Sequence, residues 1–178
     1  MNVQTQTNEH GRNDTNIETL MEKLASKKGL YRQKARKSLV ALGKPAVSYL
    51  TLALDNSKLD QLRWEAAKAL NSICDTSAIP SLVQALEDKD QDVAWLAAEA
   101  LIKLKKAAWP VLLQTLIKRG PDSVLMRQGA HHILRNQKEK GFNDLLKTLT
   151  KTLKLESISI PAATELAAFE ILKKMETE

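Results

Sequence analysis

Apolar residues recur in this chain within a nine-residue segment that is repeated at an almost constant spacing. The segment is clearest at residues 62–70 and returns at 93–101, 31 residues later. Weaker copies lie before it at 31–39 and after it at 125–133. In each copy the apolar positions fall three and four residues apart, which predicts an amphipathic helix. A period of about 31 residues predicts a protein built from stacked repeats.

A second set of apolar residues, larger and more widely spaced, lies between these copies. Its members are Ile17, Leu20 and Leu24; Val47, Leu50 and Leu54; Ile79, Leu82 and Leu86; Trp109, Leu112 and Leu116; and Phe142, Leu145 and Leu149. Each repeat therefore contains an A helix, which carries the Ala-rich segment, and a B helix, which carries the larger residues. The spacing predicts an all-α fold of about ten helices in antiparallel pairs.

Turn residues divide the chain in agreement with this pattern. Gly43 and Pro45 end the first A helix and begin its B helix, and Ser77 with Pro80 opens the second B helix. Asp90 and Asp122 are placed to cap the third and fourth A helices. We expect a disordered polar tail over residues 1–14 and one solenoid over residues 15–178. Its repeats are expected to start near residues 30, 61, 92 and 124, with half-repeats at both ends. A last helix is predicted after Pro161, with these apolar positions: Ala163, Leu166, Phe169, Ile171 and Leu172.

The composition narrows the class of protein further. Hydrophobic residues make up 43% of the chain but aromatic residues only 4%, so Ala and Leu would fill a core of closely packed helices. The single cysteine, Cys74, cannot form an internal disulfide, which favours a reducing compartment. Its place late in an A helix predicts a small core residue. The first residues contain no apolar run, and no stretch is long enough to span a membrane, so we expect a cytoplasmic protein.

The net charge of +6 is unevenly distributed. Residues 31–54 carry five basic residues and no acidic residue, and residues 89–154 carry a net charge of +7. The segments 55–88 and 155–178 are each net −3. This banding permits an anionic partner without requiring one.

The repeated segment resembles a HEAT repeat of the short bacterial type, often called phycobilisome-lyase HEAT-like repeats. The residues that carry the likeness are Asp60-Gln61-Leu62-Arg63, Asp92-Val93 and Ala97-Ala98-Glu99-Ala100-Leu101. The resemblance covers roughly residues 16–178 and implies a right-handed α-α superhelix of armadillo-like form. It also implies a scaffold that presents a curved helical surface to a protein partner, although some relatives attach bilins or bind alkylated DNA.

Two tryptophans, Trp64 and Trp95, occupy the same position in consecutive repeats. Stacked repeats would place them as neighbours, followed by Arg127 from the fourth copy. One hypothesis is a partner-binding strip, because Trp and Arg are common interface anchors. The interpretation that the pattern favours is packing of the indole rings between repeats.

A set of basic residues gathers in the second half of the chain, at the turns and on the last B helix: Lys103, Lys105, Lys106, Arg135, Lys138, Lys140, Lys147, Lys151 and Lys154. These side chains could bind an anion or the phosphates of a nucleic acid. A solvated helical face is the more ordinary interpretation, since the set contains no interleaved aromatic residues for stacking on bases.

The sequence offers no pattern typical of catalysis, a cofactor or a metal site. His131 and His132 are adjacent on a helix and point about 100° apart, so they are poorly placed to share one metal. Aligned with the third repeat, His131 matches Glu99 at an exposed position and His132 matches Ala100 in the core. We therefore predict a non-enzymatic scaffold that binds a protein and not a membrane. A nucleic-acid-binding module is the first alternative, and a chromophore lyase or chaperone is the second.

Overall fold

The computed structural model describes residues 16–119, 123–154 and 162–177, and these residues form helices and turns without any β-strand. Residues 16–24 are helical and form the first B helix. The A helices are α2 (Gly29–Leu42), α4 (Asp60–Ile73), α6 (Gln91–Leu104), α8 (Val124–Leu134) and α10 (Ala162–Glu176). The remaining B helices are α3 (Val47–Asn56), α5 (Ile79–Gln84), α7 (Trp109–Arg119) and α9 (Asn143–Leu153). None of the described helices is long and apolar enough to cross a membrane.

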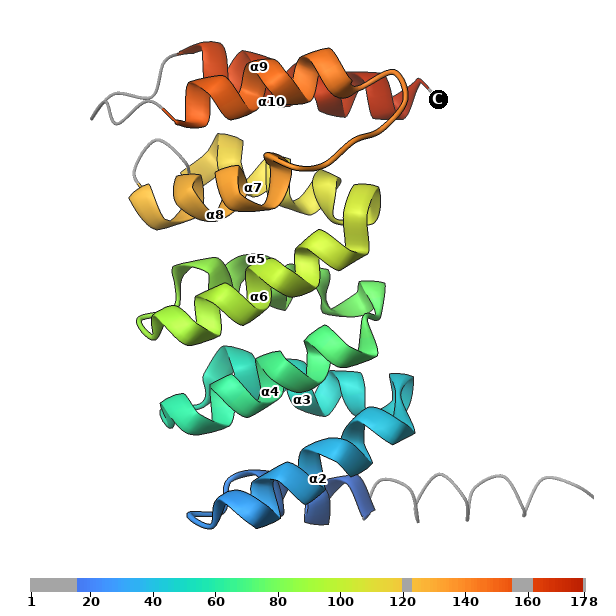
Figure 1. Cartoon of the computed structure of the whole chain (residues 1–178), viewed down its shortest axis with the longest axis vertical. Helices are drawn as coiled ribbons and strands as arrows, with labels where there is room; N and C mark the ends of the chain where they lie inside the picture. The colour runs from blue at the N-terminus through green and yellow to red at the C-terminus, as the bar shows by residue number, and fades with distance from the viewer. Residues whose placement is uncertain (1–15, 120–122, 155–161, 178) are drawn as a thin grey trace, which may run out of the picture.

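The helices are arranged in layers that follow one another along the longest axis of the molecule (Figure 1). Most layers pair a B helix with the A helix that comes next in the chain, as in α3 with α4 and α5 with α6. The A helices then contact each other from layer to layer, with α4 between α2 and α6. Because α2, α4 and α6 begin at residues 29, 60 and 91, the predicted 31-residue period is confirmed. The fold is a helical solenoid.

Local signals in the sequence explain where many of these helices begin and end. Gly43 adopts a positive φ of 67° at the end of α2, and its amide donates to the carbonyl oxygens of Leu39 and Val40. Asp90 caps α6, as predicted, by accepting from the amides of Asp92 and Val93.

The second A-to-B turn differs from the prediction. Asp75, and not Ser77, is the cap of the short 3₁₀ helix that leads into α5. Ser77 instead donates to the Asp75 carboxylate from both its amide and its hydroxyl, at 2.9 and 2.5 Å. Pro80 lies in the first turn of α5, as predicted.

Small residues line the surfaces where neighbouring layers approach. Ala66, Ala97 and Ala100 are completely buried, and so is Leu101 one residue after Ala100. Leucines fill the volume between layers, and burying one contributes roughly 1.5–3 kcal/mol. The alanines contribute mainly by allowing the adjacent helix to come close.

The last layer departs from the predicted arrangement. If the A helices contacted each other in every layer, α10 would pack against α8. Instead α10 packs chiefly against α7 and α9, and α9 packs against α8. The connection before α9 explains the change, because residues 135–142 separate α8 from α9 whereas Gly43 alone separates α2 from the next helical turn. The longer connection allows α9, a B helix, to pack against α8, an A helix.

This exchange also changes which face of α10 is buried. The buried residues are Thr164, Ala167, Ala168 and Ile171. Of the predicted apolar positions, Ile171 is buried, but Leu166 and Phe169 are 59% and 58% exposed. The periodicity therefore located the helix but assigned much of its core face incorrectly.

Several predictions concern residues outside the described part of the chain. These are the polar tail 1–14, the Asp122 cap and the start of the last helix at Pro161. The N-cap of α8 that the structure does describe is Ser123, which accepts from the amide of Met126 at 3.1 Å.

The close packing of the A helices leads to a test of overpacking at Ala97. We expect Ala97→Leu to lower the free energy of unfolding by about 1–3 kcal/mol, because the added methylenes have no space between layers. Ala41 is exposed on α2, so Ala41→Leu serves as the control and should have little effect. Urea denaturation followed by circular dichroism measures both; equal stability of the two variants would contradict the packing described here.

Candidate functional site

Two arginines in equivalent positions of α2 and α4 fasten each helix to the turn before it. Arg32 donates to the carbonyl of Ser26 at 2.9 Å, and Arg63 donates to the carbonyl of Ser57 at 3.0 Å. In both cases the acceptor lies six residues earlier. This shared contact gives the repeated arginine a structural role.

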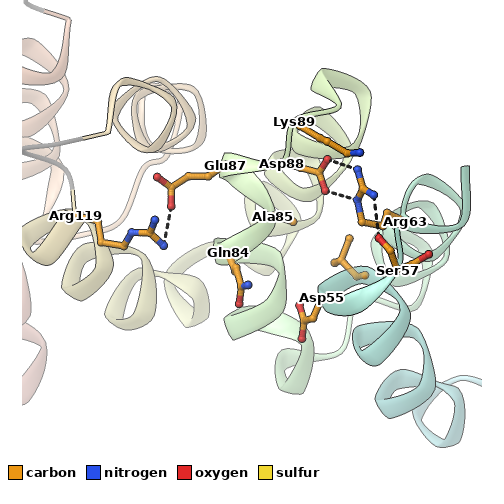
Figure 2. Close-up of a pocket in the computed structure, with 10 residues that line it drawn as sticks. Asp55, Ser57, Arg63, Gln84, Ala85, Glu87, Asp88, Lys89 and Arg119 are labelled. Carbon is orange, nitrogen blue, oxygen red and sulfur yellow. Dashed lines mark hydrogen bonds and ion pairs between the residues drawn. The ribbon is translucent and has the colours of Figure 1, made fainter. Parts of the chain in front are cut away.

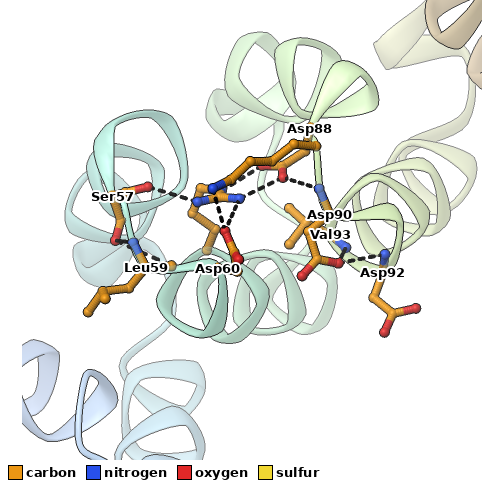
Figure 3. A network of polar contacts seen from close by, with 9 residues as sticks. Ser57, Leu59, Asp60, Asp88, Asp90, Asp92 and Val93 are labelled. Carbon is orange, nitrogen blue, oxygen red and sulfur yellow. Dashed lines mark hydrogen bonds and ion pairs between the residues drawn. The ribbon is translucent and has the colours of Figure 1, made fainter.

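Arg63 is also the centre of a buried ion-pair cluster (Figure 2), and Figure 3 shows the acidic residues Asp60 and Asp88 of this cluster. Only 5% of this residue is exposed, and its guanidinium donates to Asp88 at 2.7 and 2.8 Å and to Asp60 at 2.8 Å. The bond to Asp88 is the main cause of a raised Arg63 pKa, so the side chain stays charged despite its burial. The cluster links α4 to the turn that precedes α6.

Glu65 plays the corresponding part between α2 and α4. Its side chain is only 4% exposed, and it accepts from Arg32 at 3.1 Å and from Arg36. The helical pattern of the sequence gave no sign that a glutamate at this position would be buried, because its partners come from the preceding repeat.

A polar cavity of about 330 Å³ lies beside Arg63, between the ends of α3 and α7 (Figure 2). Its charged side chains are engaged with each other: Arg63 with Asp88, and Arg119 with Glu87 at 3.0 Å. Asp55 accepts from the Ser81 hydroxyl at 2.8 Å. These pairs hold neighbouring layers together, and the cavity has the character of a structural junction. In the described part of the chain no group of His, Cys, Asp and Glu is placed to hold a metal ion.

The two tryptophans of equivalent position have different environments. Trp64 is half-buried, with the ammonium of Lys68 4.3 Å and the guanidinium of Arg36 5.7 Å from its ring centroid. One repeat later, the positions of these two cations are occupied by Ala67 and Glu99. No cation covers the second indole from those positions, and Trp95 is 56% exposed.

Trp95 forms one wall of a groove of about 350 Å³ between α6 and α8. The apolar residues that line the groove are Leu86, Ala94, Trp95, Ala98, Leu125 and Gly129. Gly129 belongs to the floor, since a Cβ at this position would lie 3.3 Å from Leu86 side-chain atoms. A hollow between α2 and α4, two repeats earlier, has a different lining: Trp64 is there surrounded by polar and charged residues, among them Arg32, Arg36 and Glu65.

A histidine from α8 completes the Trp95 side of the groove. The His132 ring lies 4.5 Å from the Trp95 ring, centroid to centroid, at an angle of 40°. Its Nε2 is 3.1 Å from a carboxylate oxygen of Glu99. Trp95, Glu99 and His132 therefore form a contact between α6 and α8 at the edge of the groove.

This arrangement corrects the predicted alignment of the fourth repeat by one residue. The N-cap of α8 is Ser123, and it lies 33 residues after Asp90, the N-cap of α6. The repeat pattern in the sequence had predicted a spacing of 32 residues between these two repeats. Met126 is accordingly buried like Val93. His132 therefore corresponds to Glu99 and not to Ala100, so it lies beside the groove and not in the core.

The same shift moves Arg127 away from the predicted tryptophan ladder. Arg127 takes the position of Arg32 and Arg63, and Gln128, one of several α8 residues that line the groove, takes the position equivalent to Trp95. The structure thus brings Trp64 and Trp95 to equivalent places on adjacent helices but gives the third place to Gln128.

The predicted basic set is divided among several local environments. Lys103 donates to the backbone carbonyl of Asn71 at 3.2 Å and also to the side chain of that residue. Lys106 is half-buried, with its ammonium 4.5 Å from the centroid of the Phe142 ring and 4.0 Å from Glu139. The other members are exposed: Lys105, Arg135, Lys138, Lys140, Lys147, Lys151 and Lys154.

Cys74 does not occupy the core position expected from the sequence. It follows the last residue of α4 in a left-handed conformation, with φ of 57°, and is exposed. Because α4 ends at Ile73, Cys74 lies beyond the helix and its side chain is exposed. No signal in the sequence marked this end, because left-handed positions usually carry Gly or Asn.

The stacked two-helix layers and their inter-repeat contacts define the class of protein as an α-helical repeat solenoid. A comparison with protein families matches HEAT repeats over residues 47–135, which is half of the chain. The chain belongs to the HEAT repeat family. The match is to HEAT repeats in general, so the likeness to the phycobilisome-lyase type stays a prediction. A search of curated proteins gave no match.

The buried cluster predicts a large effect of removing Arg63. We expect Arg63→Ala to lower the free energy of unfolding by about 3–5 kcal/mol, because Asp88 would be left buried without its cation. Lys89→Ala is the control, since Lys89 also pairs with Asp60 but both side chains are more than half exposed. Chemical denaturation should show a much smaller change for Lys89→Ala; similar losses in the two variants would argue against a buried cluster.

His131 predicts a specific dependence of stability on pH. Burial is the main cause of its lowered pKa, and the nearby charges of Arg135, Lys154 and His132 add to the effect. Its pKa is lower in the folded than in the unfolded state, so the unfolded state binds the proton first as pH falls through the normal histidine range. This contribution destabilises the fold at low pH and disappears above that range.

We therefore expect His131→Gln to lose less stability than the natural chain between about pH 7.5 and 5.5. Urea denaturation at both pH values measures the difference. An equal loss of stability in the two proteins would mean that His131 titrates as it does in the unfolded chain.

Proposed function

We propose that this HEAT-repeat chain is a non-enzymatic scaffold that binds a protein segment in the groove between α6 and α8, with Trp95 as the main contact. HEAT repeats are commonly protein-interaction scaffolds. The observation that carries the proposal for this chain is the exposure of Trp95 next to an apolar groove. A large aromatic side chain of this kind contributes strongly when a partner covers it.

The lining of the groove indicates the chemistry of the partner. Leu125 is 47% exposed at the opposite wall from α8, and with Trp95 it offers two apolar walls to one inserted side chain. Gln91 and Gln128 at the rim can bond to the backbone of an extended segment. The proposed ligand is therefore a peptide segment that inserts an aliphatic or aromatic side chain, with polar contacts around it.

Nucleic-acid binding remains the second candidate, supported by the exposed lysines Lys147, Lys151 and Lys154 on and just after α9. Phosphate contacts from these side chains would give binding that weakens steeply with salt. Phe142, the aromatic residue directly before α9, is buried, so it is not available to stack on bases. The groove is therefore the better supported site.

The groove can be tested with a displayed library of random peptides selected against the folded chain. We expect selected peptides to share an apolar anchor residue and to lose at least about tenfold in affinity for Trp95→Ala and for Leu125→Ala, as is usual for a central aromatic contact. Isothermal titration calorimetry with synthetic copies of the selected peptides gives the affinities.

Trp64→Ala is the matched control, because it removes the same residue from the same repeat position beside a hollow that is lined mainly by polar and charged residues. Leu52→Ala controls for loss of an exposed apolar residue, since Leu52 is 65% exposed on α3. Peptides that bind Trp95→Ala as tightly as the natural chain would refute the proposed site. Binding of duplex DNA at low salt, lost in a Lys147, Lys151 and Lys154 triple Ala variant, would favour the second candidate.

A further inference from the structure

The outward face of α10 exposes two large apolar side chains that the repeat fold does not use. Leu166 is 59% and Phe169 58% exposed, and they lie three residues apart, on the same side of the helix. The residues of α10 that are buried, such as Ala168 and Ile171, point toward the other side. An apolar helix face of this kind commonly marks an interaction surface.

Charged residues are placed symmetrically around Phe169 on this face. Glu165 comes four residues before it and Lys173 four residues after it, and both are exposed. Residues four apart lie on the same side of a helix, so Glu165, Phe169 and Lys173 follow one line along the surface. The line is acidic at one end, aromatic in the middle and basic at the other end.

Such a line is complementary to itself when it is reversed. If a second α10 lies antiparallel to the first with the two Phe169 rings at the centre, each Glu165 faces a Lys173. A two-fold axis requires this kind of self-complementary surface.

We propose that a second copy of this chain covers the outward face of α10, so that two solenoids join through antiparallel α10 helices. The self-complementary order of charges favours a second copy of the chain, because both ends of the pattern then find an opposite charge. An unrelated partner would not require the acidic and basic ends to match each other. The contact is confined to one 15-residue helix and its neighbour, so the interface is smaller than in most permanent dimers. The dimer should accordingly dissociate in roughly the micromolar range.

Sedimentation equilibrium of the full chain, from roughly 1 µM to a few hundred µM, measures the association. Glu165→Lys places Lys opposite Lys in both halves of the dimer, and Lys173→Glu places Glu opposite Glu. We expect each single variant to weaken dimerisation by about tenfold or more, because like charges that face each other repel. The double variant Glu165→Lys with Lys173→Glu restores opposite charges and should return to within about threefold of the natural chain.

Lys58→Glu is the charge control, because it makes the same change of charge as Lys173→Glu at an exposed site in the turn between α3 and α4. Phe169→Ala tests the apolar centre and should also weaken the dimer. Circular dichroism confirms that each variant keeps its helical content. A natural chain that is monomeric over the whole range, or a double variant as weak as the single ones, would overturn the proposal.

Discussion

The layers from α2 to α8 depend on how closely each A helix can approach the A helix of the next layer. Ala66, Ala97 and Ala100 are completely buried where this approach occurs, and none of them has a side chain that would keep the helices apart. A single pair of helices cannot bury both of its faces, so stability comes from contacts between layers. The positions of Trp64, Trp95 and the groove between α6 and α8 follow from this stacking.

Charged residues at the layer boundaries add specificity to that apolar contact. Arg63 joins α4 to the start of α6 through Asp88, and Glu65 joins α4 back to α2 through Arg32 and Arg36. Such contacts favour one register between helices, because a shift of one residue would leave buried charges without partners. Contacts between layers also explain why the two tryptophans differ in exposure. Arg36 and Lys68 lie over the ring of Trp64. One repeat later, the equivalent positions beside Trp95 are Ala67 and Glu99.

Much of the fold could be predicted because the repeat signal is local and periodic. The spacing of residues 62–70 and 93–101 gave the period, and Gly43 and Asp90 marked helix boundaries that the structure confirms. The register of the fourth repeat was missed because Leu125 and Met126 are both apolar, and only packing decides which one is buried. The exchange in the last layer was missed because a connection of eight residues, 135–142, has no periodicity that specifies its path.

The candidate site was predicted only in part for the same reason. Repeat position identified Trp95 as a candidate, but the groove beside it depends on Leu125, Gly129 and His132, whose placement follows from the corrected register. Which face of α10 is exposed likewise depends on which helices α10 packs against. Contacts between repeats, and not the pattern within one repeat, determine both surfaces.

The register between α6 and α8 is the claim on which the groove depends most directly. Nuclear Overhauser contacts from the Trp95 indole protons in solution test it. The structure predicts contacts to the ring of His132, which lies 4.5 Å from the indole between ring centroids. Contacts from the indole to His131 and Arg127 in place of His132 would show that α8 packs in the other register, and would contradict this account.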